Sequence, residues 1–428
     1  MAIFDVLAVL MVLAATFGWV NDRYVRLPIT VGVMAMGLTL SLALIALSLV
    51  YPSIKVDAER FLSLIDFDQL LLHGVLGFLL FAGALHIELG DLREHRLSIG
   101  VLAVVGTLLS TGIVGGLCWL LSRSLELSLT PYQCLLFGAL ISPTDPIAVL
   151  GMLKSLGAPR HLEVQIAGES LFNDCVGVVV FLALLQFGGR PMPAAGRLTL
   201  DLLVLVAREV LGGAALGLVL GLLAYLMLKR IDHYQVEVLI SLALVMGGYA
   251  LAERLHLSAA ITAVTAGLLV GNQGRTFAMS DRTRQHLDAF WELIDEILNA
   301  LLFVLLGLEV LALTVRREYV LAGILAVPAV LLARFVATGL SLQLIRAGTS
   351  PAPHTVRLLT WGGLRGGLAV ALALVLRDHL PARQADVLLV MTYFVVVFSV
   401  LVQGLSMKPL VRLYVSASGD QGSSNRPS

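Results

Sequence analysis

Charged side chains are scarce in this chain of 428 residues: Asp, Glu, Lys and Arg together make up 14% of it. A soluble domain carries about a quarter charged residues. Hydrophobic residues reach 58%, and the mean hydropathy is +0.92. Acidic and basic residues balance at 29 each, and no basic tail is present that would bind nucleic acid. The composition excludes a disordered chain, a nucleic-acid-binding protein and an ordinary soluble enzyme, and it indicates a protein embedded in lipid.

Cysteine is also rare, and motifs for catalysis are absent. The three cysteines, Cys118, Cys134 and Cys175, lie in apolar runs and have neither the even number of a disulfide framework nor metal-ligand spacing. The sequence contains no HExxH, no GxSxG and no GK-containing phosphate loop. We therefore expect a protein that is not an enzyme and carries no cofactor. A filter sequence such as TVGYG is missing too, which weighs against a cation channel.

Long apolar runs dominate what is present. A bilayer core takes about 20 apolar residues of helix. Thirteen such runs predict an all-α polytopic membrane protein. Residues 1–415 are expected to form one transmembrane domain, and the Ser/Gly-rich residues 416–428 a short disordered cytoplasmic tail. The predicted spans are about 2–20, 28–51, 66–86, 97–122, 132–153, 163–187, 200–229, 234–252, 256–271, 289–313, 317–345, 354–376 and 385–414.

Lys and Arg are distributed unevenly between the two sides of the predicted membrane. With an odd number of spans the two termini face opposite sides. Placing the C-terminus in the cytoplasm gives the cytoplasmic loops more Lys and Arg than the outer loops have. Since cytoplasmic loops are enriched in these residues, we expect a multi-pass protein of the cell inner (plasma) membrane with its N-terminus outside.

Two predicted spans contain residues that interrupt a helix. In the fifth span Pro143 and Pro146 flank Thr144 and Asp145, and each proline leaves a carbonyl one turn earlier without its helical partner. The twelfth span has four glycines around Arg365: Gly362, Gly363, Gly366 and Gly367. Paired interrupted helices mark the binding site in many transporters. Because these spans lie seven apart, we predict an inverted repeat of two six-span halves joined by a linking seventh helix.

Polar side chains gather in the sixth span. Ser170 and Asp174 are four residues apart and share one helix face, while Glu169 and Asn173 share the adjacent face. Hydroxyl, amide and carboxylate oxygens are ligands for small hard cations, and burial raises the affinity of a carboxylate for protons. Together with Asp145, Asp174 could hold either a cation or protons. A site of this kind that faces the two sides of the membrane in turn exchanges one for the other.

Two arginines within predicted spans need partners. Removing one member of a buried ion pair typically costs about 3–5 kcal/mol. We predict a structural pair between Glu169 and Arg365, the alternative being that Glu169 carries the proton and Arg365 pairs elsewhere. Arg334 is expected to pair with Glu309.

Four motifs resemble one family of membrane transporters. The sequence is similar to the NhaP-type sodium/proton antiporters of the monovalent cation/proton antiporter superfamily, which are related to the eukaryotic sodium/proton exchangers. The resemblance runs from about residue 5 to residue 410, and it is carried by SPTDPIAV, GESLFNDCVGVVVF, EILNALLFVLLGLE and WGGLRGGLAVAL in the fifth, sixth, tenth and twelfth spans.

The resemblance implies a fold and a set of roles. It implies a thirteen-helix inverted-repeat homodimer that exchanges Na⁺, with Li⁺ as a second candidate, for H⁺ by alternating access. Asp174 would be the main ion and proton carrier, with Asp145, Ser170 and the Thr144 carbonyl as further ligands. The Asn173–Asp174 pair is typical of electroneutral members, and the family ion pair maps onto Glu169 and Arg365.

The sequence departs from the family pattern at one point. Many relatives have an acidic residue in the third helix where this chain has Ala82, so a third acidic group at the site is not expected. Oxygen ligands alone do not separate Na⁺ from K⁺, and a K⁺/H⁺ antiporter on the same scaffold stays open as the alternative. The expected partners are monovalent cations, protons, the lipid bilayer and a second copy of the chain.

Overall fold

The computed structural model describes residues 3–27, 29–48, 50–51, 53, 74–145, 149–150, 153, 160–187, 195–274, 279–309, 316–345 and 353–412. Within these ranges the chain is almost wholly helical, and no strand longer than an isolated bridge occurs. Pro146, the tail 416–428 and the first part of the third predicted span lie outside the described residues.

The helices follow the predicted spans closely. Each of the thirteen predicted ranges contains helix in its described part, which confirms the all-α membrane fold. Among the described residues, eight helical stretches are long and apolar enough to cross a membrane, and α4 and α8 are shorter apolar helices. The α-helices are α1 (Ile3–Val20), α2 (Ile29–Ser48), α4 (Leu76–Leu85), α5 (Leu89–Glu94), α6 (Arg96–Val101), α7 (Thr107–Ser124), α8 (Pro131–Ile141), α10 (Arg160–Phe187), α11 (Ala195–Leu228), α12 (Tyr234–Arg254), α13 (Ala259–Leu269), α15 (Asp281–Glu309), α16 (Arg317–Ile345), α17 (Pro353–Gly362), α18 (Gly367–His379) and α19 (Ala382–Phe398).

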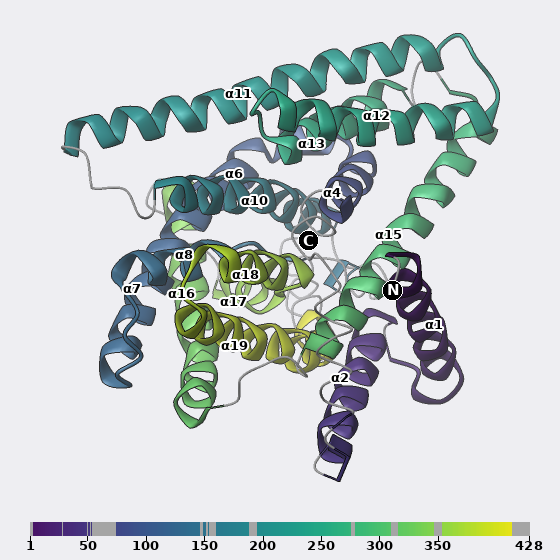
Figure 1. Ribbon diagram of the computed structural model, residues 1–428. Helices are drawn as coiled ribbons and strands as arrows, with labels where there is room; N and C mark the ends of the chain where they lie inside the picture. The colour runs from purple at the N-terminus through teal and green to yellow at the C-terminus, as the bar shows by residue number, and fades with distance from the viewer. Residues whose placement is uncertain are drawn as a thin grey trace, which may run out of the picture.

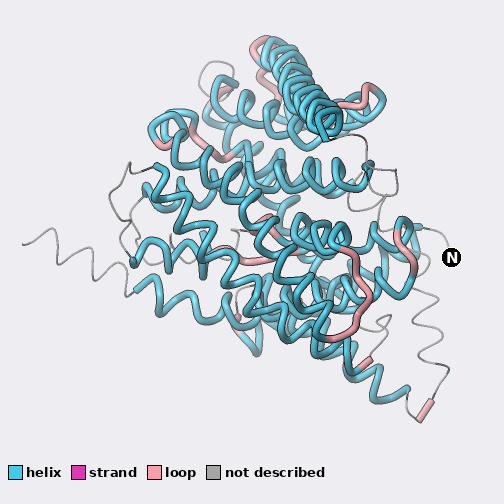
Figure 2. The backbone as a smooth tube through the Cα atoms, turned by 90° about the vertical axis from the view of Figure 1, so that its left-hand side faces the viewer, coloured by secondary structure: helices cyan, strands magenta, loops and turns pink. Residues whose placement is uncertain are grey.

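The helices form two groups joined by a long diagonal helix (Figure 1). The long helix α11 lies along one side of the molecule and packs against α12 and α13. A bundle of α7, α8, α10 and α16 to α19 lies on the other side (Figures 1 and 2). Helix α15 runs from α12 to α2 and α1. Helix α11 covers the range predicted for the linking seventh helix. In the sequence it lies between the two segments that contain the helix breaks.

Close packing between α2 and α15 depends on two glycines. A Cβ added at Gly307 would lie 2.7 Å from Cα of Gly37, so Gly307 has no room for a side chain, and a Cβ at Gly37 would lie 3.3 Å from Cα of Gly307. Small residues let backbones approach closely in membrane helix packing. Nearby, the Ser41 hydroxyl donates to the carbonyl of Gly307 at 2.6 Å. These contacts join α15 to the N-terminal pair of helices.

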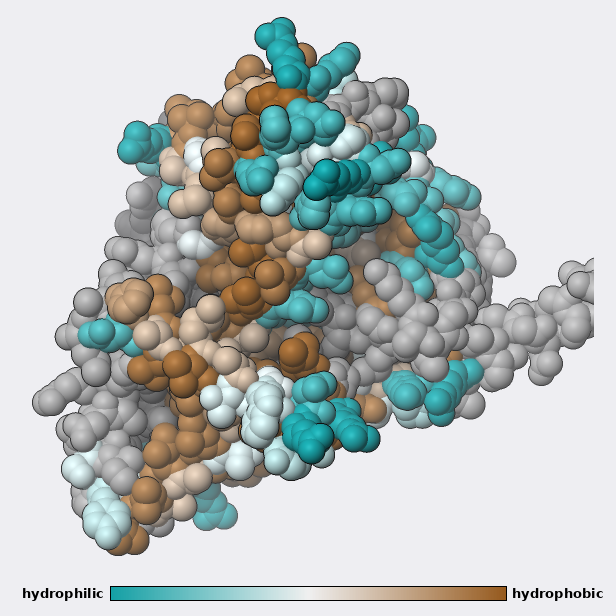
Figure 3. Space-filling view, turned by 90° about the vertical axis from the view of Figure 1, so that its right-hand side faces the viewer, coloured by the Kyte–Doolittle hydropathy of each residue, from teal (hydrophilic) through white to brown (hydrophobic). Residues whose placement is uncertain are grey.

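Much of the outer surface is apolar. On α1 the side chains of Phe4, Val12 and Trp19 are 77%, 64% and 62% exposed. Figure 3 shows hydrophobic residues that run continuously across the face on which α1, α2 and α15 lie. A soluble protein rarely exposes so large an apolar area, and in a membrane this surface contacts lipid.

Candidate functional site

The two interrupted helices cross each other at their breaks. Helix α8 ends at Ile141, and residues 142–145 continue as non-helical chain. Helices α17 and α18 are separated by residues 363–366. Asp145 and Leu364 form an antiparallel bridge in which the Asp145 N–H donates to the Leu364 carbonyl at 2.8 Å. The predicted discontinuous helices are therefore confirmed, and their breaks lie in direct contact.

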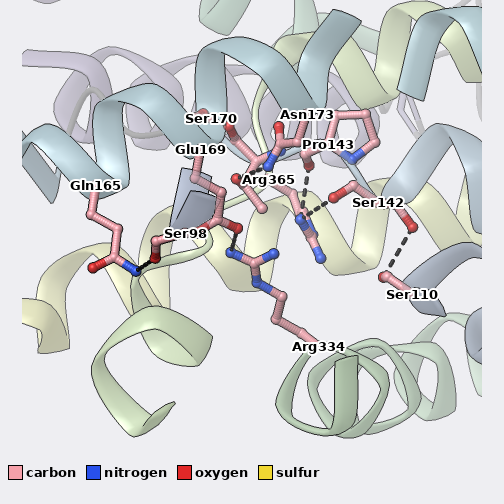
Figure 4. Close-up of polar contacts among 11 residues, drawn as sticks. Ser98, Ser110, Ser142, Pro143, Gln165, Glu169, Ser170, Asn173, Arg334 and Arg365 are labelled. Atoms are coloured by element: carbon pink, nitrogen blue, oxygen red, sulfur yellow. Dashed lines mark hydrogen bonds and ion pairs between the residues drawn. The ribbon is translucent and has the colours of Figure 1, made fainter. Parts of the chain in front are cut away.

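Arg365 binds the carbonyl groups that the fifth-span break releases. Its Nη1 donates to the carbonyls of Ser142 and Pro143, each at 2.8 Å, and its own N–H donates to the Ser399 hydroxyl at 2.8 Å. The side chain is fully buried, and Figure 4 shows its guanidinium group directed at Ser142 and Pro143. Backbone groups released inside a membrane must be satisfied within the protein. A side chain of one broken helix thus satisfies the backbone of the other.

Asn173 of α10 holds the fifth-span break in place. Its Oδ1 accepts from the Thr144 N–H at 3.1 Å, and its Nδ2 donates to the Thr144 hydroxyl at 2.7 Å. The Ser170 hydroxyl donates to the Thr144 carbonyl. The structure therefore brings Thr144, Ser170 and Asn173 together as the sequence predicted. Both polar atoms of the Asn173 side-chain amide are hydrogen-bonded to Thr144, which makes Asn173 a positioning residue here.

The predicted pair between Glu169 and Arg365 is wrong. Glu169 binds Arg334 of α16, whose Nη2 donates to Oε1 of the carboxylate (Figure 4). The two side chains are 2% and 4% exposed, so this is a buried ion pair. Arg365 is occupied by carbonyl groups instead. The side chain of Glu309, the partner expected for Arg334, lies outside the described residues.

Sequence reasoning missed Arg334 as part of the site. The available signal was an arginine in the middle of the apolar helix α16, which must have a buried partner. Spacing along the chain does not say which of several distant carboxylates faces it. The choice depends on the packing of α16 beside α10 and the crossover, which only the structure supplies.

Asp145 and Asp174 lie near each other beside the crossover. Both side chains are half-buried, and each is close enough for its charge to act on the other. The Asp145 carboxyl lies against Gly366, where an added Cβ would overlap it, so a glycine is required at that point of the crossover. Arg365 also acts on the charge of Asp174. The geometry places two carboxyl groups, a hydroxyl and a non-helical run of carbonyls in one region.

Helix α4 contributes no acidic group near this region. Ala82 is buried at 2% exposure, and its carbonyl is bound by the Nδ1 of His86 at 2.8 Å. On α15, Asp295 acts electrostatically on Asp145. An acidic group of the tenth predicted span thus lies close enough to interact with Asp145.

Residues 10–413 match the family model described as sodium/hydrogen exchanger, transmembrane. The chain belongs to the sodium/hydrogen exchanger family. Within this family it is 48% identical to the Na⁺/H⁺ antiporter NhaP of Pseudomonas aeruginosa over 95% of this chain and 96% of that protein. It is 34% identical to the Na⁺/H⁺ antiporter NhaH of Halobacillus dabanensis, over 90% and 95% of the two chains.

A solved member of the same group has the same fold. The sodium proton antiporter MjNhaP1 of Methanocaldococcus jannaschii superimposes with a TM-score of 0.74 and covers 96% of this chain and 97% of its own. The two sequences are 17% identical. The resemblance noted from the sequence motifs is confirmed by the family match and by this shared fold.

Proposed function

We propose that this chain is a secondary active antiporter that exchanges Na⁺ for H⁺ by alternating access, with Li⁺ as a second substrate. The observation that carries the proposal is the crossover of two broken helices beside a pair of half-buried carboxyl groups, Asp145 and Asp174. Membership of the sodium/hydrogen exchanger family supports it, as do the names of the relatives, which are Na⁺/H⁺ antiporters.

The cation ligands in this proposal are all hard oxygens. The carboxylates of Asp145 and Asp174 supply the charge, and the Ser170 hydroxyl and the Thr144 carbonyl complete the set. Oxygen donors of this kind suit an alkali cation rather than a transition metal. The Ser170 hydroxyl donates its proton to the Thr144 carbonyl, which leaves the lone pairs of the hydroxyl oxygen to bind a cation. Na⁺ is the cargo here and not a resident cofactor.

Exchange follows from competition for the same carboxyl groups. A carboxylate in a membrane is costly without a counter-charge. One proton and one monovalent cation therefore bind the pair in turn and exclude each other, so that each cation carried one way is balanced by one proton carried the other way. Asn173 is neutral and Glu169 is paired with Arg334, so Asp174 is the one carboxylate of these three positions that is open to exchange, which supports electroneutral exchange. The fixed charges of Glu169 and Arg334 cancel and stay unchanged through the cycle.

The proposal also covers the oligomeric state of the chain, its membrane and its orientation. We infer a homodimer in the inner (plasma) membrane, with the N-terminus outside and the C-terminus in the cytoplasm. The bias of Lys and Arg between the loops supports this orientation.

The test is cation-induced proton movement in everted membrane vesicles that contain the full chain. Addition of Na⁺ or Li⁺ should dequench a pH-sensitive dye, and an Asp174→Asn variant inserted at the same level should give no response. A Na⁺ response no larger than that of the variant would defeat the assignment. A response to K⁺ alone would assign the chain to K⁺/H⁺ exchange, and a current without proton movement would indicate a channel.

A further inference from the structure

A glutamate far from the crossover is buried without a hydrogen-bond partner. Glu237 lies in the first turn of α12, and its side chain is 0% exposed. Both carboxyl oxygens are buried, and neither has a hydrogen-bond partner among the described residues. Buried polar groups are nearly always hydrogen-bonded. Glu237 therefore needs an explanation that the crossover does not supply.

The surroundings of Glu237 are apolar. The cluster of buried side chains in which α12 packs includes Leu228 of α11, Ile240 of α12, and Leu287 and Trp291 of α15. Helices α4 and α13, which also pack against α12, have no charged residue in their sequences. The last part of α11, residues 210–228, is likewise uncharged.

The charged group that acts on Glu237 within the described part of the chain is, like Glu237 itself, acidic. It belongs to Asp232, in the loop that precedes α12. The Asp232 Oδ1 accepts from the hydroxyls of Ser280 and Thr283 at 2.8 and 3.2 Å, at the start of α15. A nearby like charge disfavours ionisation of a second carboxyl group.

Other titratable groups lie near this end of α12 and α15. Arg284 lies 3.9 Å from the Asp281 carboxylate, and Asp288 also has a partner. The ring of His286 packs on that of Tyr234 with 4.5 Å between the ring centroids. The side chain of His233, the N-cap residue of α12, makes no capping hydrogen bond and is exposed, as are Lys229 and Arg230. Arg275 lies in 275–278, outside the described residues.

A carboxyl group in such a place is either protonated or bound to a cation. We propose that Glu237 is a second proton-binding site of the chain, separate from the Asp145–Asp174 pair, and that its proton holds α12 against the first half of α15. Loss of the proton leaves an uncompensated negative charge in an apolar contact, next to Asp232, and loosens that contact.

Helix α15 connects this site to the crossover. Near Glu237 it is bound to α12 by the Trp291 Nε1, which donates to the Ser241 hydroxyl at 3.0 Å. One turn after Trp291, the charge of Asp295 acts on Asp145. Two turns later, Leu302 lies against Gly367 at the start of α18. A change in the packing of α12 on α15 is thus transmitted to the ion site. This part of the inference, the pH response of exchange, rests on the proposed function.

The first test measures stability and does not depend on transport. Thermal unfolding of the full chain in detergent micelles is followed across pH. A proton that the folded chain holds and the unfolded chain releases lowers the folding equilibrium constant as pH rises, by up to about tenfold per pH unit. Glu237→Gln keeps the shape without the titration, so it should flatten this slope. The matched control Glu253→Gln removes an exposed glutamate from the same helix and should keep it.

A wild-type slope in Glu237→Gln would overturn the inference. Should that variant not fold, Glu237→Met offers an apolar side chain of similar length. Failure of both to fold would also overturn the inference, because a protonated carboxyl group is replaceable by a neutral one. Loss of the same slope in Arg275→Gln would assign an ion pair between Glu237 and Arg275 instead.

The second test measures exchange in vesicles at several pH values. Glu237→Gln should retain exchange and shift or flatten its pH profile, whereas Glu253→Gln should follow wild type. An unchanged profile with an inactive Asp174→Asn control would overturn this inference alone. Full activity of Asp174→Asn would overturn the proposed function and leave the stability result standing.

Discussion

The buried pair between Glu169 and Arg334 makes a quantitative prediction about stability. Truncation of either member leaves the other charge uncompensated in an apolar environment, which typically costs about 3–5 kcal/mol. A chain of 428 residues that follows the per-residue unfolding entropy of globular proteins loses roughly 3–6 °C in melting temperature for such a change. Arg334→Met and Glu169→Leu should each lower the melting temperature in detergent by this amount.

A double variant distinguishes the effect of losing the ion pair from the effect of leaving one buried charge without its partner. Replacing both charges by apolar residues is often neutral or stabilising. The variant Glu169→Leu with Arg334→Met should therefore melt within about 2 °C of wild type, in line with roughly 1–2 kcal/mol. Arg317→Ala is the matched control, because Arg317 is exposed at the start of the same helix and should have no effect.

Additive losses of stability in the double variant would contradict a direct contact between Glu169 and Arg334. Side chains in direct contact show coupling energies of about 0.5–3 kcal/mol in a double-mutant cycle. A double variant as unstable as the sum of the single variants would mean that Glu169 and Arg334 do not bind each other. Rescue of Glu169→Leu by a change at Arg365 would restore the pair predicted from sequence.

Three further predictions concern the crossover and the α2–α15 contact. Asp145→Asn should abolish or strongly weaken Na⁺-driven dye dequenching while the protein still inserts, as judged by its level in washed membranes; normal activity would remove Asp145 from the mechanism. Asn173→Ala, which removes both bonds to Thr144, should reduce Na⁺ affinity and stability together, by about 1–3 kcal/mol in the melt; an affinity change without destabilisation would make Asn173 a direct ligand. Gly307→Leu should lower the detergent melting temperature, whereas Gly18→Ala, with nothing within 4 Å, should not.

The helices could be predicted from sequence because membrane spans have a strong local signal. Apolar runs of sufficient length predict their own helices, and α10, α12 and α16 begin or end within a few residues of the predicted ranges. The breaks were predictable for the same reason. Proline removes a backbone donor and glycine weakens a helix, and both effects are local.

Pairing between distant helices was not predictable in the same way. Glu169 and Arg334 are 165 residues apart, and the sequence offered several arginines and several glutamates in spans with no rule to match them. Arg365 binds backbone carbonyl groups, and every residue has a backbone carbonyl, so the sequence does not indicate which ones are bound. Thr144 and Asn173 were placed at the site by motif, while the two-bond contact between them needed the geometry.

The hydrogen bonds at the crossover limit how the molecule can move. The fifth-span break is tied to the twelfth by the Asp145–Leu364 bridge and by Arg365, and to α10 by Asn173 and Ser170. Sliding one broken helix alone would rupture these bonds inside lipid, where no water replaces them. A gating motion that keeps these bonds intact would therefore move the three segments as one rigid unit.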